Sequence, residues 1–235
     1  MNIFDATIVD YLSKFSQTSK SFDAFMAFIV DNNCVKGVVL VTMLWFFWFQ
    51  KSAENVYNRE CVIISVLSCL VAITVGRALA LWLPFRFRPI LNSGIHFIKP
   101  FGSQALLLGS MSSFPSDNAV MFFSLASGIF LISRKIGMLT YLYVLVVICF
   151  PRVYLGYHFP TDILAGAAIG ILITFIISRD KISKPITKQV FVFSAKHTGI
   201  FYALTFLLIY EIARMFNEVR VAGVYLLDFL HIHIY

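Results

Sequence analysis

The sequence predicts an all-α fold: a polytopic membrane bundle of six transmembrane helices, with interfacial helices at its N-terminus. Hydrophobic residues make up 59% of the 235 residues and charged residues only 13%, whereas soluble domains are about half apolar and a quarter charged. The apolar residues, among them 25 phenylalanines, form runs separated by short polar segments, as in helices that lie in lipid. This composition excludes a disordered chain, a collagen-like chain and a small disulfide scaffold.

Residues 1–33 form a first segment, in which charged residues interrupt the apolar pattern. Its apolar run from Phe22 to Val30 is too short to cross a bilayer, which needs about 20 apolar residues. Apolar side chains such as Leu12 and Phe15 recur at roughly helical spacing. We therefore expect one or two interfacial helices on the membrane surface rather than a cleavable signal peptide.

Residues 34–215 contain six apolar runs, which we interpret as the transmembrane helices of one six-span bundle. Several runs are shorter than an ideal span, but helix tilt and long side chains at helix ends compensate for such a deficit. Residues 216–235 are predicted to be a C-terminal tail, because their apolar stretch is again too short to span. The predicted spans cover residues 35–49, 61–83, 119–133, 136–150, 163–178 and 199–215.

Charges in the loops predict the orientation of the bundle. Lys and Arg residues follow the first, third and fifth runs, so the positive-inside rule places these loops in the cytoplasm and both termini outside. Because the net charge of +7 falls mainly in such loops and not on one amphipathic face, we exclude nucleic acid as a partner. The chain length and short loops fit a bacterial inner membrane. The loop residues are Lys51, Arg59, Arg134, Lys135, Arg179, Lys181, Lys184, Lys188 and Lys196.

Three polar segments interrupt the apolar pattern with residues that lipid does not tolerate unpaired. They cover residues 76–89, 112–119 and 151–162. Because the predicted spans alternate in direction, all three segments fall at the same membrane face, which the loop charges identify as the periplasmic or exterior one. Their convergence predicts a functional site at that face.

Four arginines in these segments, together with two predicted helix starts, indicate an anion site. The planar guanidinium groups match the oxygens of a phosphate group. Pro115 and Pro160 have the pattern of first helical residues, and helix N-termini offer free N–H groups and a partial positive charge to an anion. A phosphoryl group is the expected occupant. The arginines are Arg77, Arg86, Arg88 and Arg152.

His158 precedes the second of these helix starts, and Asp162 lies four residues further along the chain. A carboxylate at this spacing can hold the imidazole in one tautomer and leave its other nitrogen free to attack phosphorus. The pair therefore predicts a phosphohistidine intermediate. We predict no metal and no other cofactor, because arginines and helix amides already supply positive charge.

Together these residues resemble the type 2 phosphatidic acid phosphatase family of integral membrane lipid phosphatases. The family has three motifs, K-x-x-x-x-x-x-R-P, P-S-G-H and S-R-x-x-x-x-x-H-x-x-x-D. The resemblance covers about residues 60–180. The matching residues are Arg88 and Pro89, then Pro115, Ser116, Asp117 and Asn118, and then Arg152, His158 and Asp162.

The resemblance implies a membrane enzyme that removes the terminal phosphate of a lipid phosphate or diphosphate, such as undecaprenyl diphosphate or phosphatidylglycerophosphate. It implies His158 as the nucleophile and Asp162 as the residue that orients it. Its partners are the lipid substrate and membrane lipids, and the sequence indicates no oligomeric state. The candidate phosphate-binding residues are Arg77, Arg86, Arg88, Ser116, Asp117 and Arg152.

Three positions depart from the family motifs. Leu81 stands where the first motif has a basic residue, for which Arg77 or Arg86 can substitute, and Pro151 replaces a serine. Asn118 stands where the family has the histidine that protonates the leaving oxygen, and an amide cannot deliver a proton. A phosphate monoester that leaves from a diphosphate needs less help from a general acid, because its second pKa is ~6.

Asn118 therefore favours a lipid diphosphate as substrate, a disabled enzyme, or a substitution made to trap substrate. Two alternative functions stay open at this point. A phosphotransferase would pass the phosphoryl group from histidine to another lipid instead of water. A lipid-phosphate binding or translocating protein would keep the pocket without turnover, because Asn118 stands in the place of the acid.

Overall fold

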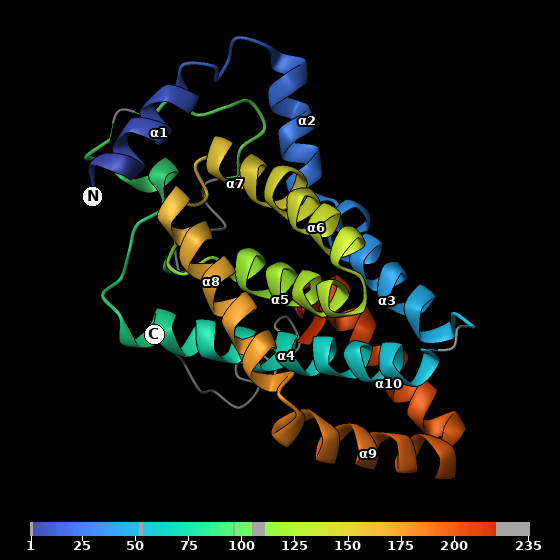
Figure 1. Ribbon diagram of the computed structural model, residues 1–235. Coiled ribbons are helices and arrows are strands. Elements are labelled where there is room, and N and C mark those ends of the chain that lie inside the picture. The colour runs from blue at the N-terminus through green and yellow to red at the C-terminus, as the bar shows by residue number, and fades with distance from the viewer. Residues whose placement is uncertain (1, 52–53, 96, 105–110, 220–235) are drawn as a thin grey trace, which may run out of the picture.

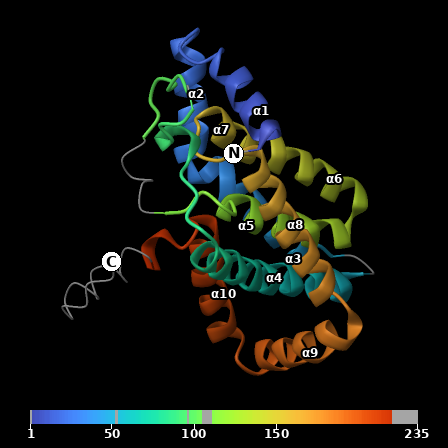
Figure 2. The same cartoon turned by 90° about the vertical axis from the view of Figure 1, so that its left-hand side faces the viewer.

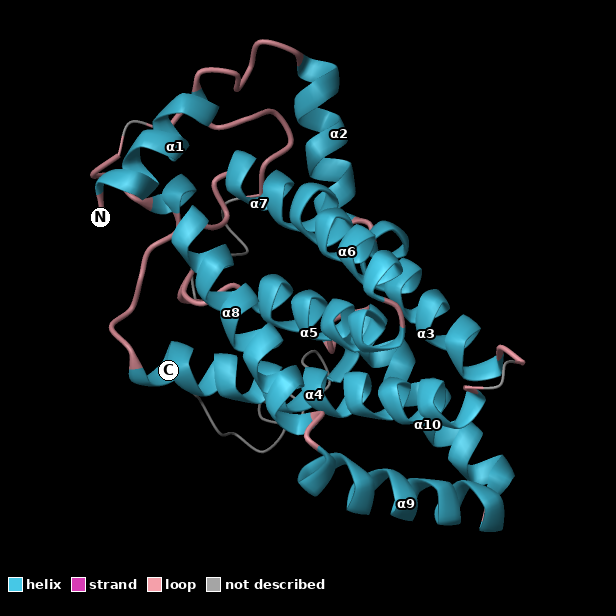
Figure 3. Cartoon of the chain, in the orientation of Figure 1, coloured by secondary structure: helices cyan, strands magenta, loops and turns pink. Residues whose placement is uncertain are grey.

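The computed structural model describes residues 2–51, 54–95, 97–104 and 111–219. Within these ranges the chain is helical with connecting loops and has no strand, as Figure 3 shows. The predicted all-α fold class is confirmed.

The elements follow one another in a simple order along the chain. A π-helical turn, η1, links the second and third helices, and a second one, η4, lies between α6 and α7. The helices are α1 (Ile3–Ser13), α2 (Lys20–Asp31), η1 (Cys34–Val38), α3 (Val39–Phe49), α4 (Asn55–Trp82), the 3-10 turn η2 (Pro89–Leu91), α5 (Asp117–Ile132), α6 (Arg134–Tyr143), η4 (Val144–Cys149), α7 (Phe150–Tyr154), α8 (Pro160–Ile177), α9 (Asp180–Lys196) and α10 (Thr198–Ala213).

Each of the six predicted spans corresponds to a helix, but the helices differ in length. Three helical stretches in the described residues are long and apolar enough to cross a membrane: α4, the continuous stretch Arg134–Tyr154 and α8. A fourth span is possible if α2 and the stretch Cys34–Phe49, which meet at a bend of 65°, are one broken span. α5 and α10 are shorter apolar helices. The chain is therefore an integral membrane protein, and the count of six spans stays a prediction.

The helices are arranged so that the two ends of the molecule differ in character. Figures 1 and 2 show α1, α2 and α7 together at one end and α9 at the other. The basic segment after α8, which we predicted to be a loop, is the helix α9. Its Ser183 and Thr187, four residues apart, are buried, while Lys181, Lys184 and Lys188 are exposed. The basic residues thus form the outer face of an amphipathic helix.

α5 lies at the centre of the bundle, and every residue from Asn118 to Ile129 is buried. It packs against α4, α6 and α8. α8 approaches it so closely that a Cβ atom at Gly170 would lie 2.4 Å from the carbonyl oxygen of Val120. A hydrogen bond of 2.9 Å between Ser124 and Thr174 also joins the two helices. This tight contact fixes the first half of α5 against the second half of α8.

The N-terminal segment is tied to the bundle by buried carboxylates. Asp23 of α2 accepts hydrogen bonds from the backbone N–H of Phe101, at 2.9 Å, and from the hydroxyl of Tyr154. The predicted interfacial position of residues 1–33 stays a prediction, and the bend between α2 and α3 raises the alternative that α2 enters the bilayer. Of the predicted tail, 216–235, all but residues 216–219 lies outside the described residues.

Candidate active site

The structure brings the three polar segments together at the end of the bundle that carries α1 and α7. Three backbone hydrogen bonds connect them: Ser113 N–H to Arg86 at 2.9 Å, Ile90 N–H to Gly156 at 3.0 Å, and Ser116 N–H to Asp162 at 3.1 Å. Segments far apart in the sequence therefore form one continuous framework of loops and helix starts.

A tight turn between α7 and α8 positions the histidine. Gly156 has a φ of +70°, a conformation that favours glycine, and a Cβ atom there would lie 2.5 Å from the ring of Phe97. The N–H groups of Tyr157 and His158 then return to the carbonyl oxygen of Arg152, at 2.8 and 3.3 Å. The turn places Arg152 and His158 on the same wall.

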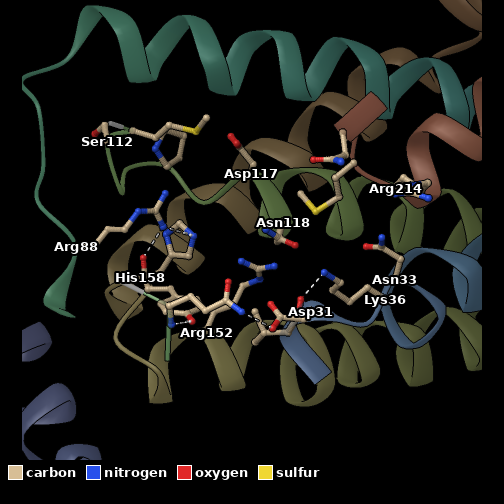
Figure 4. Close-up of a pocket in the computed structure, with 17 residues that line it drawn as sticks. Asp31, Asn33, Lys36, Arg88, Ser112, Asp117, Asn118, Arg152, His158 and Arg214 are labelled. Carbon is tan, nitrogen blue, oxygen red and sulfur yellow. Dashed lines mark hydrogen bonds between the residues drawn. The ribbon is translucent and has the colours of Figure 1, made fainter. Parts of the chain in front are cut away.

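That wall belongs to a cavity of about 370 Å³, within the usual size of a small-ligand site. Figure 4 shows how its charged and polar side chains converge from different helices and loops. Five of the nine predicted site residues line it: Arg88, Asp117, Asn118, Arg152 and His158. The other four lie outside the lining: Arg77, Arg86, Ser116 and Asp162.

The imidazole of His158 is buried and held at both nitrogens. Its Nδ1 lies 2.9 Å from the carbonyl oxygen of Ser113 and 3.6 Å from Oδ2 of Asp162. Both groups accept hydrogen bonds, so Nδ1 carries the proton and Nε2 is unprotonated in the neutral ring. Nε2 lies 3.3 Å from Nη1 of Arg88. The carbonyl of Ser113 is thus the closest group that sets the tautomer, and Asp162 reinforces it.

Burial lowers the pKa of His158 below its ordinary value of 6.5, and the charges of Arg88 and Arg152 act in the same direction. Asp162 opposes this effect by hydrogen bonding and charge, but the net direction is downward. The ring is therefore neutral near pH 7. A neutral imidazole whose Nε2 is unprotonated is the form that can act as a nucleophile once the phosphate replaces Arg88 as the partner of Nε2.

Two of the predicted arginines remain in the cavity wall. Arg88 is buried, and its Nη1 donates a 2.7 Å hydrogen bond to the carbonyl oxygen of Tyr157. Arg152 is also buried, its Nε has no hydrogen-bond partner, and no carboxylate pairs with it among the described residues. A buried guanidinium without a counter-ion favours binding of an anion in the cavity.

Arg77 has a different environment from the one predicted for it. Its Nη1 forms a 2.8 Å ion pair with Oδ2 of Asp117. It lines an adjoining apolar groove of about 630 Å³ rather than the polar cavity. Asp117 lines both spaces. The other residues that line the groove are apolar except for Thr74, and most belong to α4: Leu70, Ile73, Thr74, Ala78 and Leu81, with Met121, Met215 and Phe216.

Arg86 is likewise removed from the cavity, which differs from its predicted role in phosphate binding. Two buried carboxylates hold its guanidinium: Asp162 at 2.5 Å and Asp5 at 2.6 Å. It also donates to the hydroxyl of Thr161 at 2.9 Å and stacks on the ring of Phe159. With these partners, Arg86 ties α1 to the start of α8.

The two predicted helix starts also differ. α8 begins at Pro160 as predicted, but Asp5 already accepts a 3.0 Å hydrogen bond from the N–H of Thr161 in its first turn. A protein carboxylate therefore occupies this helix terminus. α5 begins at Asp117, after the N-cap Ser116, and not at Pro115. Its first turn faces the cavity through Asp117 and Asn118.

Asn118 lines the centre of the cavity, and its Oδ1 is buried without a hydrogen-bond partner. Ser116 is fully buried outside the lining, and its hydroxyl is also without a partner. Sequence reasoning did not identify Ser113, Lys36 and Arg214, the last two of which line the cavity. Ser113 acts through a backbone carbonyl, for which the residue type gives no signal.

Comparison with known proteins finds a family match over the segments that form this cavity. Residues 82–185, which include all the motif residues, match the model of the PAP2 superfamily. This segment is similar to that superfamily in sequence. The family likeness extends to curated relatives over most of the chain.

Undecaprenyl-diphosphatase BcrC of Bacillus subtilis (strain 168) is 24% identical over 164 residues, which is 70% of this chain and 77% of that protein. Lipid A 1-diphosphate synthase of Escherichia coli (strain K12) is 28% identical over 174 residues, 72% of each chain. The crystal structure of Aquifex aeolicus LpxE aligns with 75% of this chain and 98% of its own, at 21% identity and a TM-score of 0.47.

Proposed function

We propose that this protein is a lipid-diphosphate phosphatase that forms a phosphohistidine on His158. One observation carries the proposal: a buried, neutral imidazole keeps its proton on Nδ1 and turns Nε2 toward a cavity lined by arginines. Such a ring is a nucleophile for phosphorus, and the arginines stabilise the charge of the transferred group.

The reaction takes place in two steps. Arg152, Arg88 and the first turn of α5 bind the terminal phosphate, and Nε2 of His158 attacks its phosphorus. The bond to the bridging oxygen breaks, and its electron pair leaves with the lipid monophosphate. Water then attacks the phosphohistidine, the N–P bond breaks, and both protons of the water leave with the released phosphate. The imidazole returns to its neutral form.

Two features support a lipid diphosphate as the substrate. Asn118 can donate a hydrogen bond but no proton to the leaving oxygen. A lipid monophosphate that leaves from a diphosphate does not need that proton, because it is weakly basic, with a second pKa of ~6. The apolar groove shares Asp117 with the polar cavity, so it offers a path for the lipid chain. A relative named undecaprenyl-diphosphatase fits the same substrate class.

A phosphotransferase is the second candidate. One relative bears the name lipid A 1-diphosphate synthase, which describes the making of a lipid diphosphate. In this alternative a lipid phosphate, instead of water, accepts the group from His158. Adding a lipid phosphate acceptor to the assay separates the two, because a transferase then forms a new lipid diphosphate in place of free phosphate.

The test compares purified wild-type protein with His158→Ala on undecaprenyl diphosphate, and His197→Ala serves as a matched control because His197 is exposed and remote. We expect phosphate release and an acid-labile phosphoenzyme from the wild type and the control, and neither from His158→Ala. Binding of inorganic phosphate should persist in His158→Ala, since the arginines remain. Full turnover by a folded His158→Ala protein would refute the phosphohistidine mechanism.

A further inference from the structure

Lys36 is a buried cation that the mechanism above does not use. Its side chain is 5% exposed, and its ammonium donates a hydrogen bond to the carbonyl oxygen of Val30. No ion pair involving Lys36 occurs in the described part of the chain. Asp31 lines the same cavity but is exposed to solvent. Burying an ammonium without a carboxylate partner is costly, so this position is suited to a bound anion.

Lys36 lines the same cavity as His158 from the opposite side. Figure 4 shows Arg88 and His158 on one side, Lys36 and Arg214 on the other, and Asn118 between them. A diphosphate consists of two anionic phosphoryl groups joined by one oxygen. The arrangement of cations on both sides of an amide therefore matches a diphosphate better than a single phosphate group.

The local backbone explains how a residue so distant in sequence reaches the site. α2 ends at Asp31, and the chain bends by 65° into the π-helical turn η1, which carries Lys36. π-helical turns are frequent at functional sites. A Cβ atom at Gly37 would lie 2.2 Å from the carbonyl oxygen of Ala213, so glycine is required for η1 to contact the end of α10.

We propose that Lys36 binds the lipid-linked phosphate of a diphosphate substrate and stabilises the negative charge that this group gains when the terminal phosphate is transferred. The inference rests on the proposed function and specifies its substrate class. As the bond between the terminal phosphorus and the bridging oxygen breaks, the electron pair stays on the lipid phosphate. Asn118 offers this oxygen no proton, so a cation balances the charge.

Lys36 suits this role better than Arg214, its neighbour in the cavity lining. Arg214 is more than one-third exposed and forms a 2.7 Å ion pair with Glu218. Its charge is therefore already neutralised in part and screened by water. The ammonium of Lys36, shielded from solvent and bonded to a neutral carbonyl, exerts a stronger effect on a phosphate group in the cavity.

The experiment measures kcat/KM of Lys36→Met on undecaprenyl diphosphate and on undecaprenyl phosphate, with Lys20→Met as the control at an exposed lysine of α2. A charge-assisted hydrogen bond predicts a loss of about 10- to 100-fold on the diphosphate. The monophosphate places nothing charged beside Lys36, so its rate should change by less than about twofold. Equal losses on both substrates, or no loss on either, would overturn the proposal.

A second variant, Lys36→Gln, separates the loss of charge from misfolding. A binding measurement tests the role of Lys36 without turnover. Gln can still donate to the Val30 carbonyl but has no charge, so it should reproduce the selective loss with a thermal unfolding midpoint near that of the wild type. Titration calorimetry with inorganic diphosphate and inorganic phosphate provides the second arm. Absence of turnover by the wild type would reject the proposed function alone. Unchanged diphosphate affinity in both variants would reject the role of Lys36.

Discussion

Position 118 decides how much proton transfer this site can provide. Asn118 lies in the cavity with an unpartnered Oδ1, in the place where the related motif has a histidine. General acid catalysis contributes ~10²–10⁴-fold in rate when a basic oxygen leaves. An ester substrate should therefore be hydrolysed poorly by this chain, and a diphosphate much less so.

Asn118→His should raise turnover of a lipid monophosphate by at least about 10²-fold, near the lower limit for general acid catalysis, and turnover of a diphosphate by less. The pH profile should change as well. His158 must be neutral, so activity falls as the pH drops through its pKa, which burial sets below the usual value. An acid at position 118 must be protonated, so the variant gains a second decline as the pH rises through the pKa of that histidine.

The control for this substitution is Asn118→Ala, which removes the amide without adding a proton donor. Steady-state rates on both substrates across pH 5–9 provide the measurement. Equal gains on the two substrates, or a gain also in Asn118→Ala, would mean that position 118 does not supply a proton to the leaving group.

At the level of single residues, spacing in the sequence identified the side chains that a motif contains. Arg88, Arg152, His158 and Asn118 share one cavity. Lys36 could not be found in this way, because a lone lysine beside an apolar run is typical of a helix end at the membrane surface. Arg86 was assigned to phosphate because its partner Asp5 belongs to a distant helix, and spacing along the chain reveals no such pair.

Among the elements, α1 and α8 are coupled by charge. Asp5 is fully buried, and it binds both the first turn of α8 and the guanidinium of Arg86. Arg86 in turn holds Asp162, whose Oδ2 accepts the N–H of Phe159 at 2.7 Å. The start of α8, next to the turn that carries His158, is therefore tied to the N-terminal helix.

Asp5→Asn should destabilise the protein, since removing one partner of a buried ion pair costs ~3–5 kcal/mol. Asp10→Asn on the same helix is the matched control, because Asp10 pairs with Lys14 in solvent and exposed pairs contribute less than about 1 kcal/mol. Thermal unfolding in detergent should show a midpoint for Asp5→Asn well below those of the wild type and Asp10→Asn. Similar midpoints for both variants would show that the tie between α1 and α8 is not required for stability.

Element types were predictable where apolar runs are long, as for α4 and α8. The helix α9 was not, because its basic residues were interpreted as the charges of a loop. The buried face of α9 carries the small polar residues Ser183 and Thr187. These residues give the sequence no apolar periodicity that would indicate a helix. Composition does not distinguish such a helix from a polar connection.

On the scale of the whole molecule, the turn that carries His158 and the basic helix α9 lie at opposite ends. Alternation of spans predicted that the three motifs meet at one face, and the backbone hydrogen bonds between them agree with this. The bend between α2 and α3 was not predictable, because it depends on the contact of η1 with the end of α10. The side of the membrane that each end faces stays a prediction from the loop charges.

Cysteine labelling tests this orientation. In a Cys34→Ser background, which removes the exposed native cysteine, Ser93→Cys should react with an impermeant maleimide from outside the cell and Lys188→Cys only after the membrane is opened. Both positions are exposed, so the folded protein itself leaves both introduced cysteines accessible to the maleimide. The reverse pattern would place the catalytic cavity on the cytoplasmic side and exclude a substrate released in the outer leaflet.

The bond from Thr161 to Asp5 joins residues 156 positions apart, which has a consequence for biosynthesis. At about 5–20 residues per second, a ribosome needs roughly 8–30 s to make the intervening chain. Arg86 is made about halfway through this interval and Thr161 only at its end, so the carboxylate of Asp5 lacks at least one of its two partners until then. Docking of α1 against α8 is therefore a late event of co-translational assembly, which is completed only after the turn before α8 has left the exit tunnel.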